Sequence, residues 1–249
     1  MKKGYFFLLA AFCLLIASEA LAQDTARISV EPRGIEIGAL FNGTTLTAAG
    51  SIPADSEAVI RFVGASCDLH MKEKGRVGGI MWMGLDSLTF KGAPSVCLVS
   101  SAVALDRLDV RPLKLSGLAD SVRIEASGGE HQGVFQEFLK LKQKEGLYKE
   151  ILGNIQYGKK SDGQKTFQAK IPVPSRLIPG SYSLELAAVK DGKVIARAEQ
   201  PVEVSLTGFP ALLARLAFGL PALYGILATV IALLTGLGIG VVFQSKGAH

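Results

Sequence analysis

Hydrophobic and polar residues alternate along two long stretches of this chain, residues 27–104 and 162–206. In the first stretch, for example, Leu88 and Phe90 alternate with polar neighbours. Successive side chains of a strand point to opposite faces, so this period of two predicts half-buried strands. Turn signals such as Asn42-Gly43 and Asp191-Gly192 separate the apolar runs. The pattern therefore predicts a mainly β protein.

The last predicted strands have a recognisable order. A Pro179-Gly180 turn precedes a strand that contains Tyr182, and a hairpin around Asp191-Gly192 follows it. These features resemble the closing strands of immunoglobulin-like sandwiches, in which a tyrosine hydroxyl caps a nearby loop. We therefore predict an immunoglobulin-like β-sandwich over residues 23–206, with Tyr182 as the corner residue.

The period of the pattern changes between residues 130 and 152. Phe135, Phe138 and Leu139, and then Leu147, Tyr148, Ile151 and Leu152, recur at helical spacing. This spacing predicts a helical insertion of one or two amphipathic helices, with Gly146 weakening the middle. Lysines lie between the apolar positions, and they form either a solvated face or a contact with lipid headgroups or an acidic partner.

The first 22 residues have the features of a Sec signal peptide. Lys2 and Lys3 precede an apolar run of about a dozen residues, and Ala20-Leu21-Ala22 forms a cleavage site. The alternative is an uncleaved anchor, but the run is shorter than the ~20 residues that span a bilayer. We expect export and cleavage before Gln23.

The other end of the chain predicts a membrane anchor. Residues 216–243 contain no charged residue. This run is longer than the ~20 apolar residues that a spanning helix needs. We expect residues 207–243 to form a membrane-proximal segment and a transmembrane helix, and 244–249 a cytoplasmic tail. The signal peptide, rather than the positive-inside rule, sets this orientation. Gly236 and Gly240 form a small-xxx-small pair, a candidate face for helix packing.

Composition narrows the possible partners. The formal charge of +5 is mild, and the predicted location is the inner membrane with the bulk of the chain in the periplasm, so we expect no nucleic-acid partner. Two cysteines, Cys67 and Cys97, remain after cleavage. In an oxidising compartment they form either one disulfide or two separate buried thiols.

No catalytic motif or nucleotide fingerprint occurs, so we expect a protein that is not an enzyme and has no cofactor. One cluster offers soft ligands of the kind that copper prefers: Cys67, His70 and Met71. The structural alternative is a core made of Trp82, gap-filling methionines and a disulfide cysteine.

A basic run lies next to the single tryptophan. Lys72, Lys74 and Arg76 precede Trp82, and together they are our candidate binding patch for an anionic ligand or a partner's acidic surface. The alternative is an ordinary charged hairpin tip.

An ordered set of short motifs resembles a known family. The run from Lys72 to Trp82 is basic, contains glycines and ends in tryptophan; after it come Leu88-Thr89-Phe90, Pro94-Ser95-Val96, Gly146-Leu147-Tyr148, Phe167, Ile171-Pro172, Pro179-Gly180-Ser181-Tyr182 and Ala222-Leu223-Tyr224-Gly225. In order and spacing, this set resembles the transmembrane protein family Alph_Pro_TM, first noted in alphaproteobacteria, over almost the whole mature chain.

The resemblance implies a signal peptide, one span and an unknown function. It also implies a transport accessory role, because the family lies near exporters of the TauE/SafE type. Two features depart from the family pattern. Cys97 stands where an aromatic residue is expected, and the span ends without the family's tryptophan and arginine-rich tail.

Two functions follow as hypotheses. The first is a membrane-anchored, non-enzymatic binding or transport-accessory module whose partner is a transporter or another membrane protein. The second is a periplasmic copper or thiol-redox protein that uses Cys67, His70 and Met71.

Overall fold

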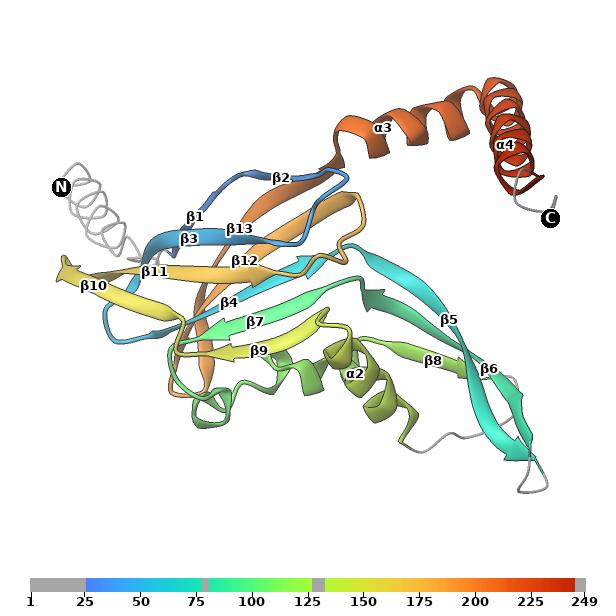
Figure 1. Ribbon diagram of the computed structural model, residues 1–249. Coiled ribbons are helices and arrows are strands. Elements are labelled where there is room, and N and C mark those ends of the chain that lie inside the picture. Colours follow the sequence, from blue (N-terminus) through green and yellow to red (C-terminus); the bar gives the residue numbers. More distant parts are fainter. Residues whose placement is uncertain (1–25, 78–80, 127–132, 245–249) are drawn as a thin grey trace, which may run out of the picture.

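About half of the described residues form strands, which are arranged in three sheets (Figure 1). The computed structural model describes residues 26–77, 81–126 and 133–244, but not the side chains of 73–77, 82, 83, 85, 86, 126, 242 and 244. The predicted signal peptide, residues 1–22, and the end of the predicted tail lie outside the described residues.

Two of the sheets form a sandwich. The four-stranded sheet has the order β1 (Arg27–Glu31), β3 (Thr44–Pro53), β11 (Gln164–Val173) and β10 (Ile155–Ser161). The six-stranded sheet has the order β2 (Gly34–Ile37), β13 (Lys193–Leu206), β12 (Gly180–Lys190), β4 (Glu57–Gly64), β7 (Cys97–Ser101) and β9 (Tyr148–Leu152). Neighbouring strands are antiparallel except for two parallel pairs, β2 with β13 and β7 with β9.

The alternation predicted from the sequence holds strand by strand. In β11, Phe167, Ala169 and Ile171 are buried, whereas Gln168 and Lys170 between them are exposed. The buried positions of both sheets belong to one hydrophobic core. The period of two therefore correctly identified the core-facing side of this strand.

Tyr182 in β12 behaves as the predicted corner residue. Its hydroxyl donates a hydrogen bond of 2.9 Å to the carbonyl of Ile178, four residues upstream. Its ring stacks on Phe62 of β4, with 5.2 Å between the ring centroids. The order β1-β3-β11-β10 and the placing of β12 between β13 and β4 also favour an immunoglobulin-like arrangement, which stays an interpretation of the fold.

The third sheet extends one hairpin of the sandwich outwards (Figure 1). It has the order β5 (Ser66–Val77), β6 (Met81–Pro94) and β8 (Arg123–Ala126), and we call it the arm. The pairing of β4 with β7 continues directly into that of β5 with β6, since the Gly64 amide bonds to the Val96 carbonyl at 3.0 Å and the Ser95 amide to the Ala65 carbonyl at 3.0 Å.

One helix packs against the arm, and it is shorter than predicted. Of the expected helical insertion 130–152, only α2 (Val134–Lys144) is helical among the described residues. Gly146 has φ +75° and ends the helical path, and the Leu147 carbonyl accepts a hydrogen bond from Cys97 in β7. The apolar residues that follow then form β9, so pairing with β7 overrides their helical spacing.

Short helices connect the remaining elements. Three 3₁₀ turns, η1 (Leu105–Leu108), η2 (Arg111–Leu113) and η3 (Leu115–Asp120), lead from β7 to β8. After β13 come α3 (Gly208–Ala214), the π-helical turn η4 (Arg215–Gly219) and α4 (Pro221–Gln244).

The last helix matches the predicted span. Within the described residues, α4 is the one helix long and apolar enough to cross a bilayer, with mean hydropathy 2.1 and no burial inside the protein over Pro221–Val241. It starts at Pro221, a favourable first helical position, because Leu220 leaves the helical conformation (φ −134°, ψ 62°). Residues 216–220 of the uncharged run therefore precede the span.

Replacing Tyr182 by Phe should lower the free energy of unfolding by about 1 kcal/mol, because the Ile178 carbonyl loses its hydroxyl donor while the ring stacking remains. Urea unfolding of the purified chain measures the change. Tyr224→Phe is the matched control, since Tyr224 is exposed on α4. Equal stability of both variants and the original chain would contradict this role for Tyr182.

Candidate binding surface on the arm

The four residues of the predicted binding patch all lie on the hairpin of the arm. Lys72, Lys74 and Arg76 belong to β5, and Trp82 belongs to β6, where it pairs with Arg76. Lys72 is exposed, whereas the side chains of the other three lie outside the described part of the structure. The structure thus places the backbones of all four residues on one hairpin, with Arg76 and Trp82 directly opposite each other.

The predicted copper ligands are divided between two faces of β5. Leu69 and Met71 face inward and pack against the core, whereas His70 is exposed and lies on the other face. The Nδ1 atom of His70 is 2.9 Å from the Thr89 hydroxyl oxygen. Cys67, His70 and Met71 therefore do not converge, because successive residues of a strand point in opposite directions. Among the described residues, no cluster of three or more His, Cys, Asp or Glu residues could hold a metal ion.

Of the two alternatives for Cys67 and Cys97, the disulfide is not formed, and both residues are free thiols. Cys67 lies opposite Ala93, and Cys97 lies opposite Val63, in one continuous antiparallel ladder. Four positions separate them, about 13 Å along an extended strand. A disulfide needs Cα atoms within about 7 Å, so the register excludes the bond. The alternative of two separate thiols is the one observed.

A groove lies between the arm and α2, with a volume of about 410 Å³. Its floor is apolar and consists of Leu88, Phe90 and Phe138, all buried. Phe90 of β6 and Phe138 of α2 stack with 4.3 Å between their centroids, which fixes the helix on the hairpin. The partly exposed Met71 and Leu141 widen the apolar lining.

The rim of this groove carries charge of both signs. Lys72 of β5 and Glu137 of α2 line it together with the apolar residues. Lys72, the one member of the predicted patch whose side chain is described, thus lines the groove. Sequence reasoning found Lys72 but missed Glu137 and Leu141. Their signal was the amphipathic pattern of α2, which indicates an apolar face without saying what that face packs against.

A second concavity lies on the outer face of the six-stranded sheet, with a volume of about 460 Å³. Arg61, Arg197, Glu185 and Glu199 line it, so its charges balance. The Arg61 Nε atom is 3.7 Å from Glu185 Oε2, and an Arg61 Nη1 hydrogen bond of 3.5 Å reaches the Pro112 carbonyl. Existing partners thus hold this arginine. In the sequence, Arg61 is the single charged residue of the apolar run 58–63, but this signal alone does not predict a concavity.

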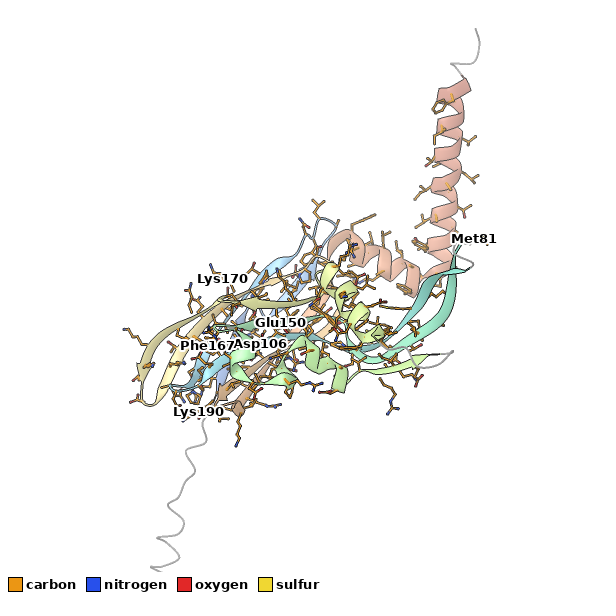
Figure 2. All side chains as sticks on the ribbon, turned by 90° about the horizontal axis from the view of Figure 1, so that it is seen from below. Met81, Asp106, Glu150, Phe167, Lys170 and Lys190 are labelled. Atoms are coloured by element: carbon orange, nitrogen blue, oxygen red, sulfur yellow. The ribbon has the colours of Figure 1, made fainter. Side chains whose placement is uncertain are left out.

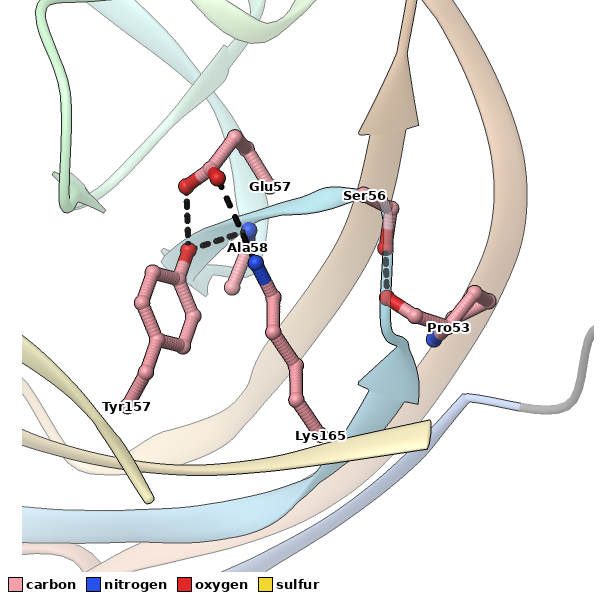
Figure 3. A network of polar contacts seen from close by, with 6 residues as sticks. All are labelled: Pro53, Ser56, Glu57, Ala58, Tyr157 and Lys165. Carbon is pink, nitrogen blue, oxygen red and sulfur yellow. Dashed lines mark hydrogen bonds and ion pairs between the residues drawn. The ribbon is translucent and has the colours of Figure 1, made fainter. Parts of the chain in front are cut away.

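A polar network joins the two sheets of the sandwich (Figure 3). The Tyr157 hydroxyl donates to Glu57 at 2.6 Å and accepts from the Ala58 amide at 2.9 Å. Lys165 Nζ lies 3.3 Å from the same carboxylate and 4.0 Å from the centre of the Tyr157 ring. Burial, helped by Glu57, raises the pKa of Tyr157, so the phenol stays protonated. Each group here has a partner, which indicates a structural role.

The glycine pair of the span lies on one face of α4. Gly236 and Gly240 line a shallow apolar groove with Ala232, Leu233, Leu237 and Val241. Apart from its chain neighbours and the nearby backbone of α4, a Cβ atom added at either glycine would meet no described atom within 4 Å. This face could admit another helix closely, and the predicted packing role stays a prediction.

The two thiols should react very differently. Burial raises the pKa of the Cys97 thiol to about 11, whereas Cys67 is half-buried. At pH 8 only roughly one Cys97 side chain in a thousand is a thiolate, the reactive form. A thiol reagent added to the native mature chain should therefore modify Cys67 first and Cys97 only after unfolding, as mass spectrometry of the digest can show.

The Cys97→Ala variant is the control, and its native reaction should match that of the original chain. Equal reaction of both cysteines in the native state, or the absence of titratable thiols, would contradict the structure.

Comparison with known proteins gives a match to a family model. No curated protein matches the chain. A family model does match, over residues 26–245, which include the sandwich, the arm and α4. The match agrees with the resemblance carried by the motifs of the arm and the span. The chain therefore belongs to the family described as "Putative transmembrane protein (Alph_Pro_TM)".

Proposed function

We propose that this protein is a non-enzymatic binding module, anchored in the inner membrane by α4, that presents its β-rich domain in the periplasm to another membrane protein. The family and the apolar helix support a single-pass membrane protein. The predicted signal peptide supports export of the domain and a cytoplasmic C-terminus.

The groove between the arm and α2 is the observation that carries the binding role. Its floor is apolar and its rim holds Lys72 and Glu137, the combination that binding sites use for contact area and for orientation. A partner segment that places an apolar side chain over Phe90 and Phe138, with a carboxylate beside Lys72, would fit this chemistry.

A transporter is the class of partner that we favour. The protein's anchor restricts it to the membrane, so its partners are molecules that reach the same surface. The family resemblance implies a place beside exporters, and the exposed glycine face of α4 offers a second contact within the bilayer.

The copper or thiol-redox alternative gains no support from the geometry. His70 lies on the face of β5 opposite Met71, and the register keeps Cys97 away from Cys67. The hairpin thus brings together neither His70 with Met71 nor Cys67 with Cys97.

The groove can be tested with two exposed leucines that differ in position. Leu141 lines the groove and is 42% exposed, whereas Leu152 of β9 is 63% exposed and lies outside it. We expect affinity purification from detergent-solubilised membranes to recover a partner membrane protein with the original chain and with Leu152→Asp, but at least about tenfold less with Leu141→Asp, because a carboxylate in an apolar contact is costly.

Lys72→Glu should weaken recovery as well, and Lys170→Glu, on the exposed face of β11, should not. Recovery of the tagged chain alone would count against the proposed function, and equal recovery by Leu141→Asp would exclude the groove.

A further inference from the structure

The segment between the sandwich and the span, Gly208–Gly219, is an apolar helix that packs into no core. None of its residues is buried. Phe209 is 62% exposed, Leu212 53% and Phe218 88%, and Arg215 is its one charged residue. A water-soluble protein rarely leaves such a surface uncovered, so this helix has a partner that the single chain does not supply.

The direction of this helix points to the lipid interface. It runs across the axis of α4, and the chain turns between the two where Leu220 leaves the helical conformation (Figure 2). A spanning helix lies within a moderate tilt of the bilayer normal. A short apolar helix that crosses this axis therefore lies in the plane of the interface, where Arg215 can reach headgroup phosphates.

A second apolar group lies at the start of the same helix. Leu40, in the turn between β2 and β3, is 97% exposed. The turn is tied to the base of α3, because the Thr207 amide donates to the Ile37 carbonyl at 3.0 Å, and a further bond of 3.2 Å from Phe41 to Gly38 closes it. Leu40 is thus held beside the point at which the chain enters the interface.

The end of the arm lies at the level at which α4 begins. Figure 2 shows Met81 level with the beginning of α4, whereas Lys190, at the other side of the domain, lies away from it. Met81 is 63% exposed. In Figure 1 the arm and α4 lie far apart, so Met81 and the interfacial helix are separate points on one surface.

We propose that the domain lies along the bilayer and contacts lipid at three places: the Gly208–Gly219 helix, Leu40 and the arm end at Met81. Lipid is the occupant because the surface is continuous with α4, the membrane span itself. This lipid contact goes beyond the proposed function, since the arm could bind a protein partner with or without it.

The single tryptophan of the chain offers a direct test, because Trp82 follows Met81 at the arm end. The full chain is reconstituted in vesicles of phosphatidylcholine and phosphatidylglycerol that carry a spin label near the headgroup or in the middle of the acyl chain. The headgroup label should reduce Trp82 emission more than the mid-chain label does. Iodide should quench the Trp82 emission less in the vesicles than in detergent. The original chain needs no substitution for this measurement.

Two variants with a relocated tryptophan calibrate the result. Trp82→Phe combined with Leu40→Trp should show the same headgroup quenching, and Trp82→Phe combined with Lys190→Trp should show none and stay open to iodide. The proposal is overturned if Trp82 behaves like the tryptophan at position 190, whatever position 40 does. Copurification through the groove would be unaffected by that outcome, so the two proposals fail separately.

Discussion

The structure depends on one constraint: a paired hairpin must leave the sandwich without breaking its ladder. The exit lies at Gly64 and Ala65 on one strand and at Pro94 and Ser95 on the other. A side chain at Gly64 would collide with the Ser95 hydroxyl and lie 2.8 Å from the Tyr182 ring, so only glycine fits. Opposite it, the buried Tyr148 hydroxyl donates to the Pro94 carbonyl at 2.7 Å. These contacts set the direction of the arm.

Aromatic packing carries this constraint to the candidate binding surface. Tyr148 of β9 meets the edge of Phe138 with 5.8 Å between the ring centroids, and Phe138 stacks on Phe90 of the arm. Sandwich, helix and hairpin thus share one cluster, whose outer side forms the floor of the groove. The exit and the aromatic cluster together hold the candidate binding surface at a fixed place relative to the sandwich.

Local patterns predicted much of this fold, and their failures have physical causes. The alternation in β11, the hydroxyl bond of Tyr182 and the apolar helix α4 each depend on residues close in sequence. The apolar residues of 147–152 have a helical spacing, yet Tyr148–Leu152 form the strand β9. Its pairing with β7 involves residues distant in sequence, which no local pattern reveals. The cysteine count left a disulfide and two separate thiols both open, because the count does not reveal the strand register that keeps Cys67 and Cys97 apart. The groove forms between the arm and α2. The sequence indicated the apolar face of each, but not that the two faces meet.

The central claim is that the arm is a fixed extension of the sandwich and not a flexible appendage. Spin labels at two exposed positions, His70 on the arm and Lys170 on β11, in a chain with Cys67→Ser and Cys97→Ala, test it by pulsed electron resonance in membranes. A single narrow distance distribution is expected, unchanged between detergent and bilayer, because the ladder and the aromatic cluster hold the arm. A broad distribution would contradict it.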